Sequence, residues 1–291
     1  MSKKVLITGA TGDTGRAAVK ASITLGLDVR ALVHRLDARA EALQALGAEV
    51  VVGDLLDIDS VVAAMAGVEA AYLVWPVQPG LVQATVNFAQ AAKEAGVATV
   101  INLSQRSANR HSQSASSRDT FLAEQVLNWS GLPVIHLRPT YFLEWLLYPW
   151  QLPFLKQGVL RMPVGQGRHA PIAADDQGRA IAALLKNPAP HIGQTIALSG
   201  PVEMDHTQMA AELSEALGRT IRFQDLPIAD YTASIEAMGV PPYIVQHLGG
   251  AMADYHNGAM AGADDNVEQL TGRRSMTVGE FARAHADVLN G

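Results

Sequence analysis

Short, nearly continuous apolar runs alternate with helix-like segments along the first half of the chain. In one such segment, Ile58, Val61, Val62 and Met65 fall at positions i, i+3, i+4 and i+7, on one face of a helix. Strands that are apolar on both faces are typical of a parallel sheet covered by helices on both sides. The pattern therefore predicts a doubly wound α/β fold. Its expected strands are residues 5–8, 29–33, 50–52, 71–74, 100–103 and 134–137.

The pattern changes after Arg138-Pro139, where three prolines interrupt an aromatic and leucine-rich stretch. Further on, Met209, Leu213 and Leu217 mark another amphipathic helix, and the sequence TVGE at 277–280 is a capping box that opens the last helix. We expect residues 1–150 to form the first domain and residues 151–291 a smaller, mostly helical domain. Residues 175–200 are expected to return to the first domain, with 195–198 as one more strand of its sheet.

Composition narrows the range of partners. The chain has 291 residues, 48% of them hydrophobic, with 22 Lys and Arg against 28 Asp and Glu. A mildly acidic protein without a basic block is not built to bind nucleic acid or an anionic membrane directly. Its apolar runs are far shorter than the roughly 18–20 residues that cross a bilayer. We expect a small-molecule partner and a monomer or homodimer.

Cysteine and histidine usage excludes several kinds of site. The absence of cysteine excludes disulfides, thiolate metal sites and a cysteine nucleophile. It also favours a cytoplasmic location, as does a start that passes from Ser2-Lys3-Lys4 directly into a strand pattern without a signal-peptide core. The nine histidines have no metal-ligand spacing, so we predict no metal. No G-x-S-x-G motif surrounds Ser104, which argues against a hydrolase.

Three glycines lie between the first predicted strand and a helix that is expected to start near Asp13. Gly9, Gly12 and Gly15 permit a tight turn and let a pyrophosphate approach the main-chain N–H groups at the helix N-terminus. Because they follow a strand and open a helix, the sequence predicts a dinucleotide site in a Rossmann-type fold. The alternative is a glycine-rich turn that binds no ligand.

The second and third strands indicate which dinucleotide binds. Arg35, beside His34 and twenty residues after Gly15, offers a charge-assisted partner for the 2′-phosphate of NADP(H), where an NAD enzyme usually has an acidic residue. The alternative is a solvated Arg35, with Asp37 taking the ribose. After the third strand, Asp54 is placed to accept a hydrogen bond from the adenine amino group. It could instead cap a helix, a role that Asp57 could also fill.

The motifs TGATGDTG, VRALVHR, VVGDLLD and SGLPVIHLRPTYFLEW together resemble the NmrA-like branch of the atypical short-chain dehydrogenase/reductases. The similarity runs over nearly the whole chain. It implies a Rossmann domain that binds NADP(H) and a small C-terminal domain that closes over the nicotinamide. Some members of this family reduce quinones, triphenylmethane dyes or azo dyes. Others are redox-sensing regulators with little or no catalysis.

The resemblance also assigns site residues. It implies that Arg35, which the adjacent His34 is placed to assist, binds the 2′-phosphate. It also implies that Asp54 and Leu55 border the adenine. Ser104 takes the position of the catalytic serine of the superfamily. The residues implied at the pyrophosphate are Gly9, Thr11, Gly12, Asp13, Thr14 and Gly15. Those implied along the ribose are Val74, Trp75 and Pro76. Those implied at the nicotinamide are Pro139, Thr140, Tyr141 and Phe142.

One motif of the superfamily is missing. None of the six tyrosines has a lysine four residues later, and Thr120 stands near the expected lysine position, so a Tyr/Lys proton relay is absent. Hydride transfer does not require this relay if an acceptor is held against the nicotinamide and water is excluded. We therefore hypothesise an NADPH-dependent reductase of a conjugated small molecule, with Ser104 and Tyr141 as hydrogen-bonding or proton-donating groups. The alternative is a non-catalytic NADP(H)-sensing regulator.

Other side chains are secondary candidates. An apolar cavity for a quinone-like or aromatic substrate could be lined by aromatic residues, which otherwise are plain core. The aromatic candidates are Trp75, Tyr141, Phe142, Trp145, Tyr148 and Trp150. His169 is expected in a loop or at the surface, with a proton donor as the alternative, and Asp175-Asp176 at the start of a helix. Tyr243, Tyr255 and His256 are further substrate-site candidates.

Overall fold

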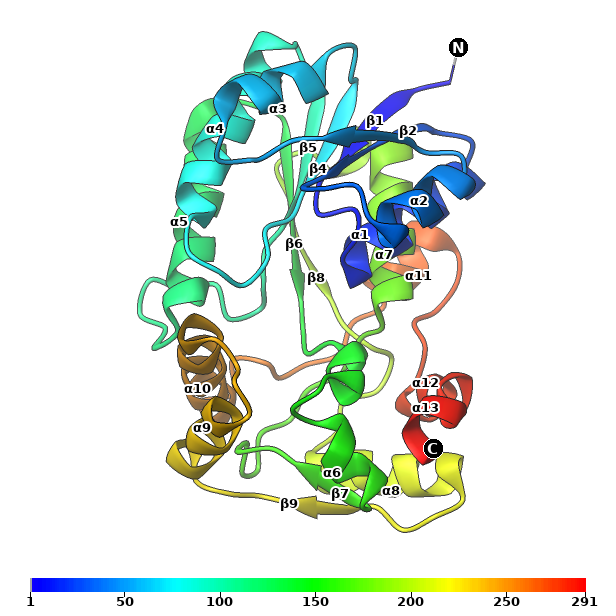
Figure 1. The fold of residues 1–291 in the computed structure, drawn as a ribbon, viewed down its shortest axis with the longest axis vertical. Helices are drawn as coiled ribbons and strands as arrows, with labels where there is room; N and C mark the ends of the chain where they lie inside the picture. The colour runs from blue at the N-terminus through cyan, green and yellow to red at the C-terminus, as the bar shows by residue number, and fades with distance from the viewer. Residues whose placement is uncertain (1) are drawn as a thin grey trace.

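A seven-stranded sheet forms the centre of the upper part of the molecule in Figure 1. The structure is a computed structural model and describes residues 2–291. Every neighbouring pair of strands in this sheet is parallel. The spatial order is β3 (Glu49–Val52), β2 (Asp28–Val33), β1 (Lys4–Ile7), β4 (Ala70–Leu73), β5 (Thr99–Leu103), β6 (Val134–Pro139) and β8 (Thr195–Leu198). The order reverses between β1 and β4, which makes this the switch point of a Rossmann-type sheet.

All seven expected strands are present, and their ends differ from the expected ones by at most two residues. The late strand at 195–198 joins the sheet beside β6, as predicted. The doubly wound parallel sheet is thus confirmed.

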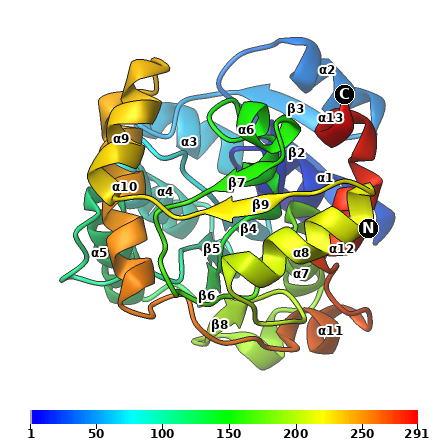
Figure 2. The ribbon, with the colours of Figure 1, turned by 90° about the horizontal axis from the view of Figure 1, so that it is seen from below.

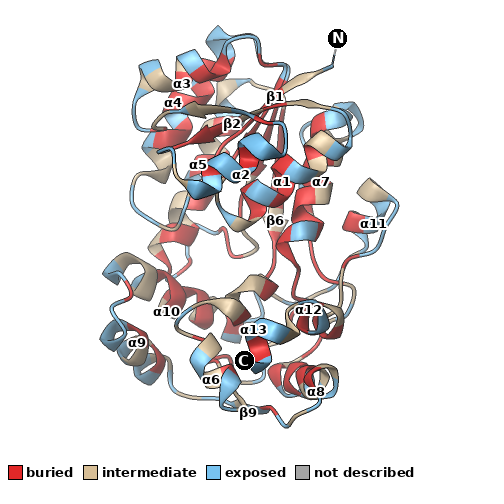
Figure 3. Ribbon diagram, turned by 45° about the vertical axis from the view of Figure 1, so that its right-hand side comes forward, coloured by how far each residue is buried: buried red, intermediate tan, exposed pale blue. Residues whose placement is uncertain are grey.

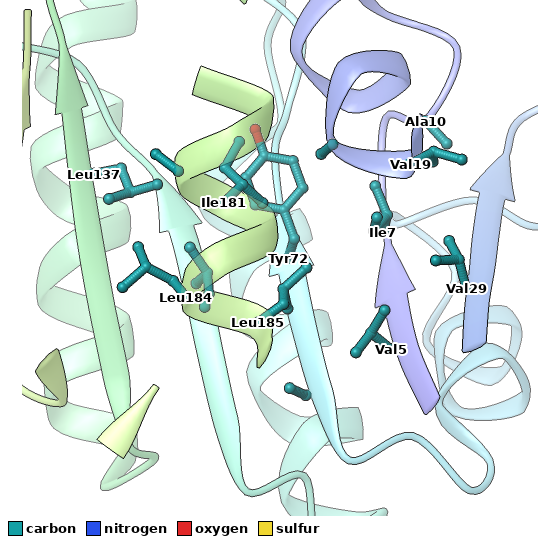
Figure 4. Close-up of a cluster of buried hydrophobic side chains, with 14 of the residues drawn as sticks. Val5, Ile7, Ala10, Val19, Val29, Tyr72, Leu137, Ile181, Leu184 and Leu185 are labelled. Atoms are coloured by element: carbon teal, nitrogen blue, oxygen red, sulfur yellow. The ribbon is translucent and has the colours of Figure 1, made fainter. Parts of the chain in front are cut away.

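Helices cover both faces of the sheet. One face carries α1 (Asp13–Thr24), α7 (Ala174–Lys186) and α11 (Asn266–Thr271), and the other carries α3 (Ile58–Met65), α4 (Leu81–Glu94) and α5 (Ala115–Ser130). Alternate residues of β1 serve the two faces. Val5 and Ile7 lie with Ile181 and Leu184 of α7 in one buried cluster, shown in Figure 4. Leu6 packs with Phe88 of α4 in the other. This alternation explains the unbroken apolar runs in the sequence.

Close contact between α1 and α7 depends on a glycine. A Cβ on Gly178 of α7 would lie 2.5 Å from the backbone carbon of Ala17 in α1, a distance that no real side chain tolerates. The two helices therefore pack almost backbone to backbone. As a result, α7 is held against the element that begins at the glycine-rich loop.

The rest of the chain packs below the carboxyl ends of the strands. A short parallel pair, β7 (Val159–Arg161) and β9 (Arg222–Gln224), lies among helices at this end (Figure 2). These helices are α6 (Leu152–Lys156), α8 (His206–Leu217), α9 (Ile228–Ala237), α10 (Pro242–His256), α12 (Val278–Ala284) and α13 (Ala286–Asn290). The expected capping box joins Thr277 and Glu280 at α12, and Asp205 and Gln208 form another at α8.

The C-terminal quarter is divided between the two parts. Val267 of α11 belongs to the buried cluster on the sheet, whereas Phe281 of α12 belongs to the lower cluster. The remaining helix, α2 (Ala38–Ala45), is mostly exposed and follows β2 at the surface (Figure 3). Among the described residues, no helix has the length and apolar character needed to cross a membrane.

Candidate functional site

The glycine-rich loop leaves no room for side chains at two of its three glycines. Gly9 follows β1 with a φ of +53°, and a Cβ on it would lie 2.6 Å from Cγ1 of Val74. A Cβ on Gly15 would lie 2.1 Å from the carbonyl oxygen of Gly9. The Gly12 N–H closes the turn by donating to that same oxygen at 2.9 Å. Such a bare main-chain corner lets a diphosphate approach closely, so the geometry fits the predicted ligand.

The first turn of α1 begins at this corner, and no side chain among the described residues caps it. Its N–H groups therefore remain available to an anion. Thr14 points into the core, where its hydroxyl accepts from Tyr72 at 3.4 Å. The Asp13 carboxylate accepts from the hydroxyl of Tyr148 at 2.8 Å and lies 3.7 Å from Arg16. Thr11 is half-buried in the loop between Gly9 and Gly12.

Arg35 stands exposed after β2. Its side chain is 74% exposed, and within residues 2–291 its single ion pair is a 3.5 Å contact from Nε to Asp37. Asp37 caps α2 by accepting from the backbone of Arg39 and Ala40, and it also binds the Arg39 guanidinium. The hydrogen bond from Arg39 lowers the pKa of Asp37 to about 2. The carboxylate is thus occupied by the cap, which leaves Arg35 and exposed His34 facing solvent.

The third strand ends in a turn that separates the two aspartates. Asp57 caps α3 by accepting from the Asp59 N–H at 3.2 Å. Asp54 instead accepts from the Leu56 N–H at 2.9 Å and is not the helix cap. Leu55 is buried, and its carbonyl accepts from Asn87 at 3.0 Å.

The end of β4 is fastened to the end of β1 across the switch point. The Val74 N–H donates to the Thr8 hydroxyl at 2.9 Å. Trp75 is half-buried and donates from Nε1 to the Gln78 carbonyl at 3.1 Å, while Pro76 is exposed. The three residues therefore follow the strand beside the glycine-rich loop, which is where the resemblance puts the ribose.

A polar network of buried Ser104, buried Glu124 and half-buried Arg138 lies between β5, β6 and α5. The Ser104 hydroxyl donates to Glu124 Oε1 at 2.5 Å. Arg138 donates to the same carboxylate from Nε at 2.9 Å and from Nη2 at 2.6 Å. Sequence reasoning missed Glu124 and Arg138. The available signals were an arginine at an alternate position of an apolar strand and a glutamate four residues after Thr120.

The helix position expected for a Tyr/Lys pair carries hydroxyl groups instead. Thr120 donates to the Ser116 carbonyl at 2.8 Å and accepts from Gln105 at 2.8 Å. Ser116 and Thr120 are both buried. Neither side chain is a strong acid or a cation, so α5 offers no proton relay of the expected kind at these positions.

The residues after β6 pack into the buried apolar cluster below the sheet, which includes Tyr141, Met162 and Phe281. Thr140 donates to the Ala170 carbonyl at 2.6 Å, and Phe142 forms a bridge with Ile172. Tyr141 is buried, with its hydroxyl 4.0 Å from Sδ of Met162. Burial raises the pKa of Tyr141 well above its ordinary value, so the phenol stays protonated. Pro139 is the last residue of β6 and is buried.

His169 lies in the connection between β7 and α7, as expected for a loop histidine, but it is not at the surface. It is completely buried and stacks on His206, with ring centroids 4.9 Å apart, against Tyr141 and Tyr255. The ring nitrogens of both histidines have no hydrogen-bond partner among the described residues. Burial lowers the pKa of His169 well below its ordinary value and that of His206 to about 4. Both rings are therefore neutral packing groups at physiological pH. A surface location was wrong because the two histidines lie 37 positions apart in the chain, and their contact leaves no local pattern.

The remaining candidates on α10 point to different places. Tyr243 donates to Asp119 of α5 at 3.0 Å, whereas Tyr255 is buried beside the histidine pair. His256 is exposed beside Gly165. His247, which the sequence did not single out, bonds the hydroxyl of Ser114 at the start of α5 at 2.8 Å. The hydrogen bonds of Tyr243 and His247 therefore dock α10 on α5.

The aromatic candidates pack mainly against one another. Tyr141 meets Trp145 edge-on at 4.8 Å, and Tyr148 meets Trp150 at 5.0 Å. Tyr148 also borders a cavity of about 370 Å³ that reaches Asp13, Glu144 and Asp175. Burial raises the pKa of Glu144 to about 7. Asp175 and Asp176 lie in the first turn of α7, as expected. The described residues contain no group of three or more side chains suited to hold a metal ion.

The chain matches a known protein family over nearly its whole length. A family model described as the NmrA-like family matches residues 1–281. An NAD(P)H azoreductase from Xenophilus azovorans is 30% identical over 282 residues, covering 97% of this chain and 98% of the relative.

Two solved structures are similar over nearly their whole length. The NADPH-dependent quinone oxidoreductase QOR2 of Escherichia coli, complexed with NADPH, has a TM-score of 0.85 and 27% identity, covering 96% of this chain and 99% of that one. The negative transcriptional regulator NmrA in complex with NAD has a TM-score of 0.83 at 20% identity, covering 99% and 96%. The second likeness concerns the fold alone.

Proposed function

The chain belongs to the NmrA-like family, and on this basis we propose that it is an NADPH-dependent reductase that transfers a hydride to a conjugated small molecule. The substrate class is a quinone or an azo or triphenylmethane dye. The observation that carries the proposal is the bare corner at Gly9 and Gly15 together with the exposed Arg35. The corner accommodates a diphosphate, and the guanidinium suits a 2′-phosphate.

The strand order sets how the dinucleotide lies. With the diphosphate at α1, the adenine half extends over β2 and β3, toward Arg35, Asp54 and Leu55. The nicotinamide half extends the other way, past Val74 and Trp75 to the ends of β5 and β6. There it meets Ser104 and the segment 139–142. When bound, NADPH supplies the hydride, and the protein orients the acceptor and excludes water.

The test is turnover by the purified chain. NADPH absorbance is followed with a panel of quinones, azo dyes and triphenylmethane dyes. Oxidation of NADPH that depends on both the acceptor and the protein supports the reductase. A chain that binds NADP(H) at micromolar concentration but oxidises none of it with any acceptor is a sensor, and this result would refute the proposal.

A second function, an NADP(H)-sensing regulator without turnover, is favoured by one observation. Ser116 and Thr120 occupy the positions at which a Tyr/Lys relay would stand, and the Thr120 hydroxyl is engaged with the Ser116 carbonyl and with Gln105. A sensor needs the dinucleotide site but no proton donor. The turnover assay separates this function from the reductase.

A further inference from the structure

The network of Ser104, Glu124 and Arg138 has a fixed hydrogen-bond polarity. Glu124 is buried on α5, and two N–H groups of Arg138 donate to its two oxygens. A carboxylate in this position only accepts hydrogen bonds. The Ser104 hydroxyl is the third donor to it and therefore uses its only proton in the hydrogen bond to Glu124. What Ser104 can still offer to another molecule is a lone pair.

The lone pair lies where the nicotinamide half of the dinucleotide is expected. Ser104 directly follows β5, and in the register of β5 with β6 it stands opposite Arg138, one residue before the end of β6. The nicotinamide ring has a single hydrogen-bonding substituent, a carboxamide, which has an N–H₂ donor and an oxygen acceptor. A serine restricted to accepting complements only the N–H₂ group.

We propose that Glu124 is a positioning residue, which fixes Ser104 as a hydrogen-bond acceptor for the carboxamide N–H₂ of the nicotinamide. This inference rests on the proposed binding of NADP(H). It assigns Ser104 to orienting the ring rather than to donating a proton. The direction of the Ser104 hydrogen bond is set by the carboxylate of Glu124, which lies on α5 one turn after Thr120, the residue at the expected lysine position.

The chain contains a matched control. Four residues beyond Glu124 on α5, Oδ1 of Asn128 accepts from Nε2 of His136 on β6 at 3.0 Å. Nδ1 of His136 in turn accepts from the side-chain amide of Asn102 on β5 at 3.1 Å. This second network also joins α5, β5 and β6, but it does not include Ser104. A variant of Asn128 therefore reports what losing such a network does to the fold alone.

The experiment compares calorimetric binding of NADP⁺ with that of its 3-acetylpyridine analogue, in which a methyl group replaces the carboxamide N–H₂. We expect the unmodified chain to bind NADP⁺ about tenfold more tightly than the analogue, as for one well-placed hydrogen bond. Ser104→Ala and Glu124→Gln are expected to reduce this ratio to about one. Ser104→Thr, which keeps the hydroxyl, and Asn128→Ala are expected to keep it.

The outcomes separate this inference from the proposed function. A chain that binds neither nucleotide refutes the proposed function. A chain that binds both with equal affinity overturns the inference and leaves the function standing, as does a preference that survives Ser104→Ala. If Glu124→Gln does not fold, Glu124→Asp takes its place, because the shorter side chain keeps the charge but withdraws it from Ser104. If Glu124→Asp still prefers NADP⁺ over the analogue, Glu124 does not position Ser104. The Ser104 variants leave the ion pair untouched and decide the acceptor role in either case.

Discussion

Arg35 is the residue on which the choice of coenzyme depends. Its neighbour Asp37 is committed to capping α2 and to Arg39, so the guanidinium of Arg35 is open to solvent on most of its surface. Replacing Arg35 by Ala is expected to weaken NADPH binding by about 1–3 kcal/mol and to leave NADH binding unchanged. Titrations with both coenzymes measure this difference. Arg39→Ala is the matched control, and an equal loss for NADPH and NADH in Arg35→Ala would contradict the assignment.

Gly15 tests the loop itself. A methyl group at this position would collide with the carbonyl of Gly9, so the loop must move. Gly15→Ala is expected to destabilise the fold by about 1–3 kcal/mol and to weaken NADPH binding at least about tenfold. Gly26→Ala, beyond the far end of α1, places its Cβ in open space and costs only the strain of its φ of +79°. Gly26→Ala should lower stability without changing affinity, and a comparable loss of affinity in both variants would mean that the loop geometry is not the cause.

At the scale of elements, the docking of α10 on α5 buries His247, and this burial makes the free energy of unfolding depend on pH. Burial lowers the pKa of His247 from an ordinary 6.5 to about 4. Below about pH 6.5 the unfolded chain takes up a proton that the folded chain excludes, so the free energy of unfolding falls between about pH 6.5 and about pH 4. The fall is about 1.4 kcal/mol per pH unit for each such group, and His206 contributes in the same window.

Chemical denaturation at pH 7 and at pH 5 measures this loss. His247→Gln is expected to reduce the difference in unfolding free energy between the two pH values. The exposed His111 provides the control, because His111→Gln should leave the difference unchanged. A pH dependence that is identical in both variants and in the unmodified chain would show that His247 titrates normally.

Elements were the easiest features to predict from the sequence. Every expected strand formed, because strands buried on both faces leave continuous apolar runs that periodicity detects. The glycine-rich loop was equally predictable from the sequence, because its steric constraints act between residues close in the chain, such as Gly9 and Gly15. Contacts between distant positions were not readable. The stacking of His169 on His206 and the convergence of Glu124 with Ser104 and Arg138 depend on how the elements pack, and no local pattern records them.

At the scale of the whole molecule, one hydrogen bond ties the lower part to the glycine-rich loop. Tyr148 reaches from the segment after β6 to Asp13, in the first turn of α1. Tyr148→Phe is expected to lower the free energy of unfolding by about 1 kcal/mol and also to change NADPH affinity, because Asp13 adjoins the diphosphate corner. Denaturation and coenzyme titration measure the two effects.

Tyr243→Phe is the matched control for this prediction. It removes another tyrosine–aspartate hydrogen bond, to Asp119 at 3.0 Å, far along the chain from the glycine-rich loop. Both variants should lose similar stability, but only Tyr148→Phe should alter the affinity for NADPH. Unchanged affinity for NADPH in Tyr148→Phe would mean that the Tyr148–Asp13 hydrogen bond and the coenzyme site are independent.

The return of β8 and α7 to the sheet after a long excursion has a consequence for dissecting the protein. A fragment that stops at residue 150 would carry six strands with an unpaired edge at β6, and it would expose the surface of α1 that Gly178 normally covers. Such a fragment is expected to aggregate through that edge. A circularly permuted version can instead be opened at a surface turn such as Gly193, because the single chain then still carries β8 and α7 and can pair the edge of β6.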